Sequence, residues 1–143
     1  GGEPLLQPAV LPLMSKLCDR GHAVLLETGG SLDIRTVDPR VVKIVDLKTP
    51  GSGEAGANLY ANVEALLPHD EVKLVLADRR DYEWAVEQIE RYDLPRRCTV
   101  LLSPVHGALD PKDLAAWVLA DKLPVRMQIQ MHKAIWGAEA RGV

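Results

Sequence analysis

Short apolar, β-branched runs alternate with longer stretches of helical periodicity along nearly the whole chain. Each run is bounded by Gly, Pro or Asp, the residues that commonly flank strands. This alternation is typical of parallel βα units, so it predicts an α/β fold with mostly parallel strands. The predicted strands are His22–Glu27, Val41–Lys48, Val72–Ala77, Thr99–Ser103 and Val125–His132, and the predicted helices are Pro8–Arg20, Ala57–Leu67, Asp81–Tyr92 and Asp110–Ala120.

The composition fits one domain with a substantial core. The 143 residues are 47% hydrophobic and 26% charged, with a net charge of −3. Phe is absent, so we expect a core of Leu, Val, Ala and Ile. No basic excess indicates direct binding to nucleic-acid phosphates. No apolar run approaches the roughly 18 residues of a membrane span and no secretory signal pattern is present, so we expect a cytoplasmic protein without a membrane partner.

Polar residues gather at the carboxyl ends of the predicted strands, which is where parallel α/β folds bind ligands. Glu27 ends one strand just before Gly29 and Gly30, and its carboxylate could accept hydrogen bonds from ribose hydroxyls or lie in solvent. Asp46 and Lys48 face the same side of the next strand, because side chains alternate along a strand. They could bind a zwitterion or hold each other as a structural ion pair, which is the commoner arrangement.

The first four residues, Gly1–Pro4, are a candidate loop around an amino-acid-like ligand. Glycines let the backbone approach a ligand closely, and Glu3 supplies a carboxylate for a ligand ammonium. Pro4 suits the entrance of a helix. An ordinary strand-to-helix turn has the same composition, so the tetrapeptide leaves both interpretations open.

Two further segments have a composition suited to ligand binding. The loop Gly51–Glu54 could wrap a ligand or act as a connector, and it lacks the Lys-Ser/Thr ending of a phosphate-binding loop. Gln128, Gln130 and His132 alternate along the last predicted strand, so their side chains would share one face. That face is either a polar outer surface or a set of hydrogen-bonding groups for a heterocycle.

Motifs for nucleophiles and metals are weak in this sequence. Cys18 and Cys98 have no second Cys or His beside them at metal-ligand spacing, so we expect two buried free thiols, with a disulfide between them as the alternative. Ser103 and His106 follow a predicted strand but lack the elbow sequence of a hydrolase nucleophile. The residues alone therefore favour ligand binding over hydrolytic catalysis.

The order of these clusters resembles the 7-carboxy-7-deazaguanine synthases, a family of radical S-adenosylmethionine (radical SAM) enzymes. The resemblance runs through the whole chain. Its first motif is shared by the wider superfamily, and its last motifs point to the synthases. The motifs are Gly1-Gly2-Glu3-Pro4-Leu5, Leu26-Glu27-Thr28, Asp46-Leu47-Lys48, Leu102-Ser103-Pro104, Gln130-Met131-His132-Lys133, Trp136-Gly137 and Arg141-Gly142-Val143.

The resemblance implies a fold and an activity. The fold is a partial (β/α) barrel of the radical SAM type without its first strands, with residues 1–143 as the carboxy-terminal part of a single core domain. The activity converts 6-carboxy-5,6,7,8-tetrahydropterin to 7-carboxy-7-deazaguanine with loss of ammonia, on the path to queuosine. The implied cofactors are S-adenosylmethionine, a 4Fe-4S cluster and Mg²⁺, and the cluster with S-adenosylmethionine supplies the radical chemistry. The implied partners are the pterin substrate, a second subunit in a homodimer, and an electron donor such as flavodoxin.

The resemblance also implies roles for residues near the start of the chain. Gly1, Gly2 and Glu3 would bind the methionyl amino group of S-adenosylmethionine, and Gly2 would also approach the substrate. Glu27 would contact the cofactor ribose. These roles agree with the chemistry expected of a glycine loop and of a carboxylate at a strand end.

Further roles follow along the chain. By the same resemblance, Lys48 and Ser52 would lie near the cofactor, and Ser103 would approach its adenosyl group. His132 would hydrogen-bond the pterin, and the tail that ends at Val143 would fold back to the substrate.

One departure from the family pattern concerns the cluster. In the family, three cluster cysteines and the Mg²⁺ ligands precede the Gly-Gly-Glu-Pro motif. Cys18 and Cys98 cannot replace them, because an iron–sulfur cluster takes about four ligands. We therefore expect this segment to be inactive alone and to belong to a longer chain. Two alternatives stay open: another radical S-adenosylmethionine enzyme, or a non-catalytic α/β ligand-binding or interaction module.

Overall fold

A computed structural model describes residues 2–137, with the backbone alone at positions 132 and 134. Its five strands form one parallel sheet in the order β1-β2-β3-β4-β5. The strands are β1 (Leu25–Thr28), β2 (Val42–Asp46), β3 (Glu71–Leu76), β4 (Thr99–Pro104) and β5 (Arg126–Met127). Strands that follow one another in sequence and in space form an arc of a (β/α) barrel, whereas a doubly wound sheet reverses its order. The α/β prediction is therefore confirmed.

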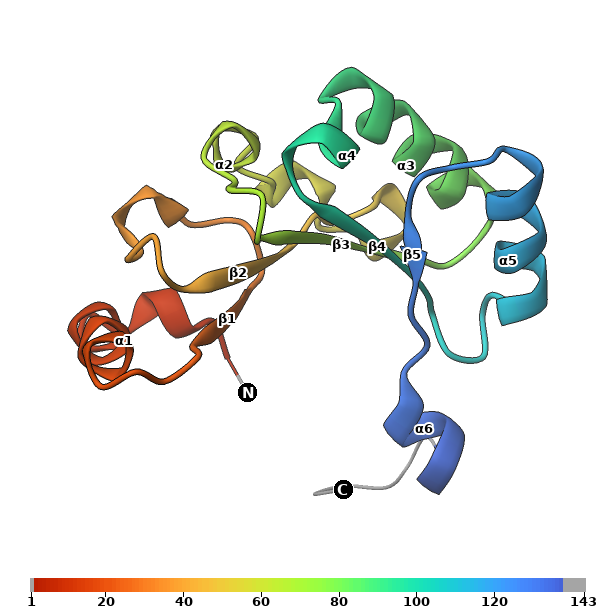
Figure 1. Ribbon diagram of the computed structural model, residues 1–143. Coiled ribbons are helices and arrows are strands. Elements are labelled where there is room, and N and C mark those ends of the chain that lie inside the picture. Colours follow the sequence, from red (N-terminus) through yellow and green to blue (C-terminus); the bar gives the residue numbers. More distant parts are fainter. Residues whose placement is uncertain (1, 138–143) are drawn as a thin grey trace.

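The helices cover one side of the curved sheet. Figure 1 shows α1 to α5 along this side, while α6 and the start of the chain lie on the other. Asp78 and Asp110 cap α3 and α5 by accepting backbone N–H bonds at 3.0 and 2.9 Å, and these helices and α1 match the predicted ones closely. The helices are α1 (Val10–Asp19), α2 (Ala61–Glu64), α3 (Arg79–Arg91), α4 (Leu94–Arg97), which was not predicted, α5 (Pro111–Ala120) and α6 (Met131–Trp136).

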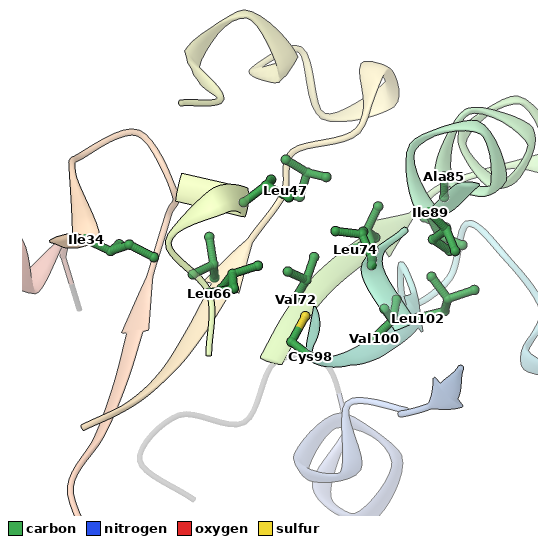
Figure 2. Packing of buried hydrophobic residues seen from close by; sticks show 14 of the residues in the cluster. Ile34, Leu47, Leu66, Val72, Leu74, Ala85, Ile89, Cys98, Val100 and Leu102 are labelled. Atoms are coloured by element: carbon green, nitrogen blue, oxygen red, sulfur yellow. The ribbon is translucent and has the colours of Figure 1, made fainter. Parts of the chain in front are cut away.

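The hydrophobic core lies between the sheet and these helices. Along β3 every second side chain is buried, and Val72, Leu74 and Leu76 are at most 1% exposed. Figure 2 shows Leu74 in the same cluster as Ala85 and Ile89 of α3. The intervening residues of β3 point away from the helices, because side chains alternate along a strand. The sheet therefore has one packed face and one face left for other groups.

The last predicted strand, Val125–His132, is wrong beyond its first residues. Only the two residues of β5 pair with β4, and the Gln128 N–H donates to the Leu102 carbonyl at 2.9 Å before the chain leaves the sheet. His132 lies in α6, so the expected row of three polar side chains on one strand face does not form. In the described sheet, β5 pairs only with β4, so few backbone hydrogen bonds keep the segment after Met127 extended. Short alternating runs are also compatible with a helix.

The predicted helix Ala57–Leu67 is reduced to the four residues of α2. The side chain of Asn58 bonds to the backbone N–H and C=O of Lys48, each at 2.8 Å. The buried Asn62 amide bonds to three backbone groups of the loop after β1. Asn side chains that bond distant backbone favour turns over a continuous helix, so these contacts override the helical pattern.

Candidate functional site

The face of the sheet opposite the helices carries polar side chains, and we call it the open face. Its residues form rows across the strands, because paired positions of neighbouring parallel strands point to the same side. One row is Glu27, Ile44, Glu71 and Thr99, and the next is Asp46, Lys73, Leu101 and Arg126. Charged groups are rarely placed on a sheet face for packing alone, so the open face is suited to binding a polar ligand.

Two cavities lie on the open face. The larger one, of about 810 Å³, extends from the loop at the start of the chain to Lys48, and part of it lies along the edge of β1, where apolar side chains of α1 such as Leu13 and Leu17 line it. The second, of about 400 Å³, extends toward β5. Both are lined by Glu27 and Lys73, so they are adjacent. These volumes lie in the range of small-molecule sites. Five predicted site residues meet here: Gly2, Glu3, Glu27 and Lys48 line the larger cavity, and Glu27 and Ser103 line the second.

The loop at the start of the chain is held by the Glu3 carboxylate. It accepts hydrogen bonds from the Thr28 hydroxyl at 3.0 Å and from the backbone N–H groups of Gly29, at 2.7 Å, and Leu5, at 3.0 Å. A Cβ built on Gly2 would meet no atom within 4 Å. The Glu3 side chain therefore fixes the loop to the end of β1, and the main chain at Gly2 is the part open to a ligand.

Asp46 and Lys48 form an ion pair at the carboxyl end of β2. Lys48 Nζ lies 2.6 Å from Asp46 Oδ2, and the two side chains are 31% and 28% exposed. Both residues line the larger cavity. The ion-pair interpretation is therefore confirmed, and the pair also stands where a zwitterionic ligand would meet it.

Ser52 lies apart from this group. Its hydroxyl donates to the Thr49 carbonyl at 2.6 Å and accepts from the Glu54 N–H at 3.1 Å, so it stabilises its own turn. It lines a third cavity of about 270 Å³ that Asp46 and Lys48 also border. Ser52 is thus adjacent to the larger cavity through Lys48.

A buried carboxylate that the sequence did not single out supports this turn. It belongs to Asp81, which lies among the charged residues of α3 but is only 1% exposed. Its carboxylate accepts hydrogen bonds from the backbone N–H groups of Gly51, at 2.7 Å, and Ala77, at 2.9 Å. A Cβ on Gly51 would overlap this carboxylate. The turn after β2 is therefore held against the end of β3 by a residue in the first turn of α3.

Several predicted site residues lie at or beyond the limits of the description. Gly1 and Val143 lie outside the described residues, and the side chain of His132 is not described. Gln130, from the same predicted group as His132, lines the second cavity, and its Oε1 atom is buried with no hydrogen-bond partner among the described residues. A buried acceptor of this kind costs free energy unless a donor reaches it, so it fits a ligand that carries N–H groups.

The cysteines of the described residues do not form a metal site. Cys18 and Cys98 are both free; Cys98 is buried as expected, whereas Cys18 is only partly buried. Burial raises the pKa of the Cys98 thiol to about 11, so it is protonated at neutral pH and is a poor ligand. Among residues 2–137 with described side chains, no three His, Cys, Asp or Glu residues lie close enough to hold one metal ion. These residues therefore do not fit a 4Fe-4S cluster.

Within the described part of the chain, no helix combines the length and the apolar character needed to cross a membrane.

Curated relatives match the chain over its whole length, although no protein-family model matches it. It is 49% identical over 146 residues to the 7-carboxy-7-deazaguanine synthase of Chlorobaculum tepidum, covering 66% of that protein. It is 45% and 31% identical to the synthases of Koribacter versatilis and Clostridium acetobutylicum, covering 70% and 67% of them. The chain belongs to the 7-carboxy-7-deazaguanine synthase family. It spans about two thirds of the length of these synthases and matches their carboxy-terminal part.

Family membership confirms the resemblance found in the sequence. The five residues gathered on the open face belong to the motifs that carried it: Gly2 and Glu3 to the first, and Glu27, Lys48 and Ser103 to those at strand ends. Lys73 and Asp81 belong to none of these motifs, and periodicity alone gave no signal for either. For this member of the synthase family, the open face is therefore the candidate site.

Proposed function

We propose that this chain forms the part of a 7-carboxy-7-deazaguanine synthase that binds S-adenosylmethionine and the pterin substrate. The reaction is the ring contraction of 6-carboxy-5,6,7,8-tetrahydropterin to 7-carboxy-7-deazaguanine with loss of ammonia, a carbon–nitrogen lyase reaction of the radical S-adenosylmethionine class. One observation carries the proposal: the motif residues Gly2, Glu27, Lys48 and Ser103, far apart in sequence, line two adjacent cavities in a chain 49% identical to a synthase.

The residues of the larger cavity suit the amino-acid end of S-adenosylmethionine. The main chain at Gly2 is open to the ligand ammonium, and the Asp46–Lys48 pair offers one group for each charge of a zwitterion. Glu27 is exposed on the open face and can accept hydrogen bonds from ribose hydroxyls. Ser103 in the second cavity stands on the far side of Lys73, where an adenosyl group or the pterin would extend.

When bound, S-adenosylmethionine supplies the radical chemistry, and the residues of this chain hold and orient it. The cluster and Mg²⁺ do not belong to the described residues, so we propose that other residues of the enzyme hold them. The homodimer, an electron donor such as flavodoxin and a cytoplasmic location stay predictions of the family resemblance, as do the roles of Gly1, Ser52, His132 and Val143.

The binding step can be tested with two matched glycine variants. Gly2 and Gly56 each have open space around a built Cβ, so the methyl group of alanine can be accommodated at both positions. Among the described residues, a methyl group at Gly2 would meet no protein atom, so it would meet a ligand bound there. Isothermal titration calorimetry with S-adenosylmethionine should show affinity at least about tenfold weaker for Gly2→Ala and unchanged for Gly56→Ala. Equal affinities of the two variants would rule out the cofactor site at Gly2.

The reaction can be tested in a chimera. The chain would replace the matching region of the Chlorobaculum tepidum synthase, so that the residues outside the match come from that enzyme. Mass spectrometry should then detect 7-carboxy-7-deazaguanine from 6-carboxy-5,6,7,8-tetrahydropterin. A folded chimera that binds S-adenosylmethionine but yields no product would contradict the synthase proposal, while leaving the cofactor site intact.

A further inference from the structure

Lys73 occupies the centre of the open face. It lies in the middle of β3, its side chain points away from the helix-covered core, and its paired neighbours are Asp46 on β2 and Leu101 on β4. It lines both cavities, which Glu27 also does. An ammonium at this position is therefore within reach of a ligand in either cavity.

The charges around Lys73 leave its ammonium without a carboxylate partner in the described part of the chain. Its row neighbour Asp46 is engaged by Lys48 at 2.6 Å, and Lys43 pairs with Asp70 at 2.9 Å. No ion pair within 4.0 Å among the described residues includes Lys73. Glu27 and Glu71 face the same side one row away.

We propose that Lys73 binds the carboxylate of a ligand held on the open face. The proposal rests on the proposed function, whose two ligands each carry one carboxylate: the methionyl group of S-adenosylmethionine and the 6-carboxy group of the pterin. Because Asp46 and Lys48 neutralise each other, Lys73 supplies the positive charge at the centre of this face. An ammonium with free donors beside a cavity forms strong charge-assisted hydrogen bonds with a carboxylate.

The test compares ligands that differ in their carboxylate. One pair is S-adenosylhomocysteine and its decarboxylated analogue, which keeps the amino group, and the other is 6-carboxypterin and pterin. Calorimetry would measure their binding to the unchanged chain, to Lys73→Gln and to Lys112→Gln, a control on the exposed side of α5. Lys73→Gln should weaken binding of the carboxylated member of one pair by about tenfold or more and leave binding of its carboxylate-free partner unchanged. Unchanged binding of that partner shows that the cavity is intact.

The outcomes separate the two sources of the carboxylate. Loss confined to S-adenosylhomocysteine assigns Lys73 to the cofactor, and loss confined to 6-carboxypterin assigns it to the substrate. Lys73→Arg should retain most of the preference for the carboxylated ligand, because arginine keeps the positive charge at this position. If the unchanged chain and Lys73→Gln prefer the carboxylated ligands over their carboxylate-free partners to the same extent, the inference about Lys73 fails and the proposed function stands. If the unchanged chain binds neither member of either pair, the inference about Lys73 and the proposed function both fail.

Discussion

Two lysine–aspartate pairs at opposite ends of β2 lie in opposite environments. Lys43 and Asp70 meet at 2.9 Å on the helix-covered side near the amino end of β2, and their side chains are 3% and 0% exposed. Lys48 and Asp46 meet at 2.6 Å beside the cavity at the carboxyl end, and each is about one-third exposed. The two pairs join the same kinds of side chain and differ in how deeply they are buried.

The comparison indicates how the two ends of the sheet divide their roles. Asp70 also accepts hydrogen bonds from the backbone N–H groups of Lys43 and Leu67, both at 2.8 Å, so the first pair ties β2 to the turn before β3. The second pair has the single side-chain bond between its members and stays accessible to a ligand. In parallel α/β folds, residues at the amino ends of the strands stabilise the fold, and residues at the carboxyl ends bind ligands. The two pairs follow that division.

The largest expected effect is at the buried pair. Asp70→Asn would leave the Lys43 ammonium buried without its carboxylate, which should lower the free energy of unfolding by about 3–5 kcal/mol. Urea unfolding monitored by circular dichroism would measure the change. The control is Glu83→Gln at the exposed Arg79–Glu83 pair, where we expect less than about 0.5 kcal/mol. A loss at Asp70 as small as at Glu83 would remove the structural side of the comparison.

An intermediate effect is expected at Asp81. This buried carboxylate uses one oxygen for Gly51 and the other for Ala77, whereas an amide presents one oxygen and one N–H₂ group. Asp81→Asn should therefore cost about 2–3 kcal/mol and loosen the turn after Lys48. Urea unfolding and hydrogen exchange of the Gly51 amide would measure the two effects.

A matched control exists for Asp81→Asn in the first turn of α5. Asp113 is also acidic and near a helix start, but it is exposed. Asp113→Asn should cost only about 0.3–1 kcal/mol, the usual interaction of a charge with a helix terminus. Equal costs at the two positions would mean that the Asp81 bonds to the turn contribute little.

Much of the fold could be predicted from the sequence, because each strand and each long helix has its own periodicity. The failures occur where tertiary contacts decide. Asn58 and Asn62 form side-chain bonds to distant backbone and convert an expected helix into turns. The segment after Met127 alternates like a strand, but β5 is only two residues long and the chain continues as a helix.

The candidate site was predictable only where it lies at strand ends. Glu27, Lys48 and Ser103 follow apolar runs, so their positions at one edge of the sheet could be expected. Lys73 lies inside a strand, and its neighbours depend on the register between β2 and β3, which periodicity does not specify. Asp81 has the sequence context of an exposed helix charge, and only the packing of the turn at Gly51 makes it buried.

The smallest expected effect on stability, and the sharpest test of the comparison, is Asp46→Asn. Because the Asp46–Lys48 pair is partly exposed, its loss should change the free energy of unfolding by less than about 1 kcal/mol. The same substitution removes the carboxylate that we propose for the ligand ammonium, so S-adenosylmethionine should bind about tenfold more weakly by calorimetry. Asp70→Asn makes the same chemical change and should show the reverse pattern, with a large loss of stability and unchanged affinity while the protein is folded. If Asp46→Asn instead destabilises the chain as strongly as Asp70→Asn and leaves affinity unchanged, the pair at the cavity is structural, and the division between the two ends of β2 does not hold.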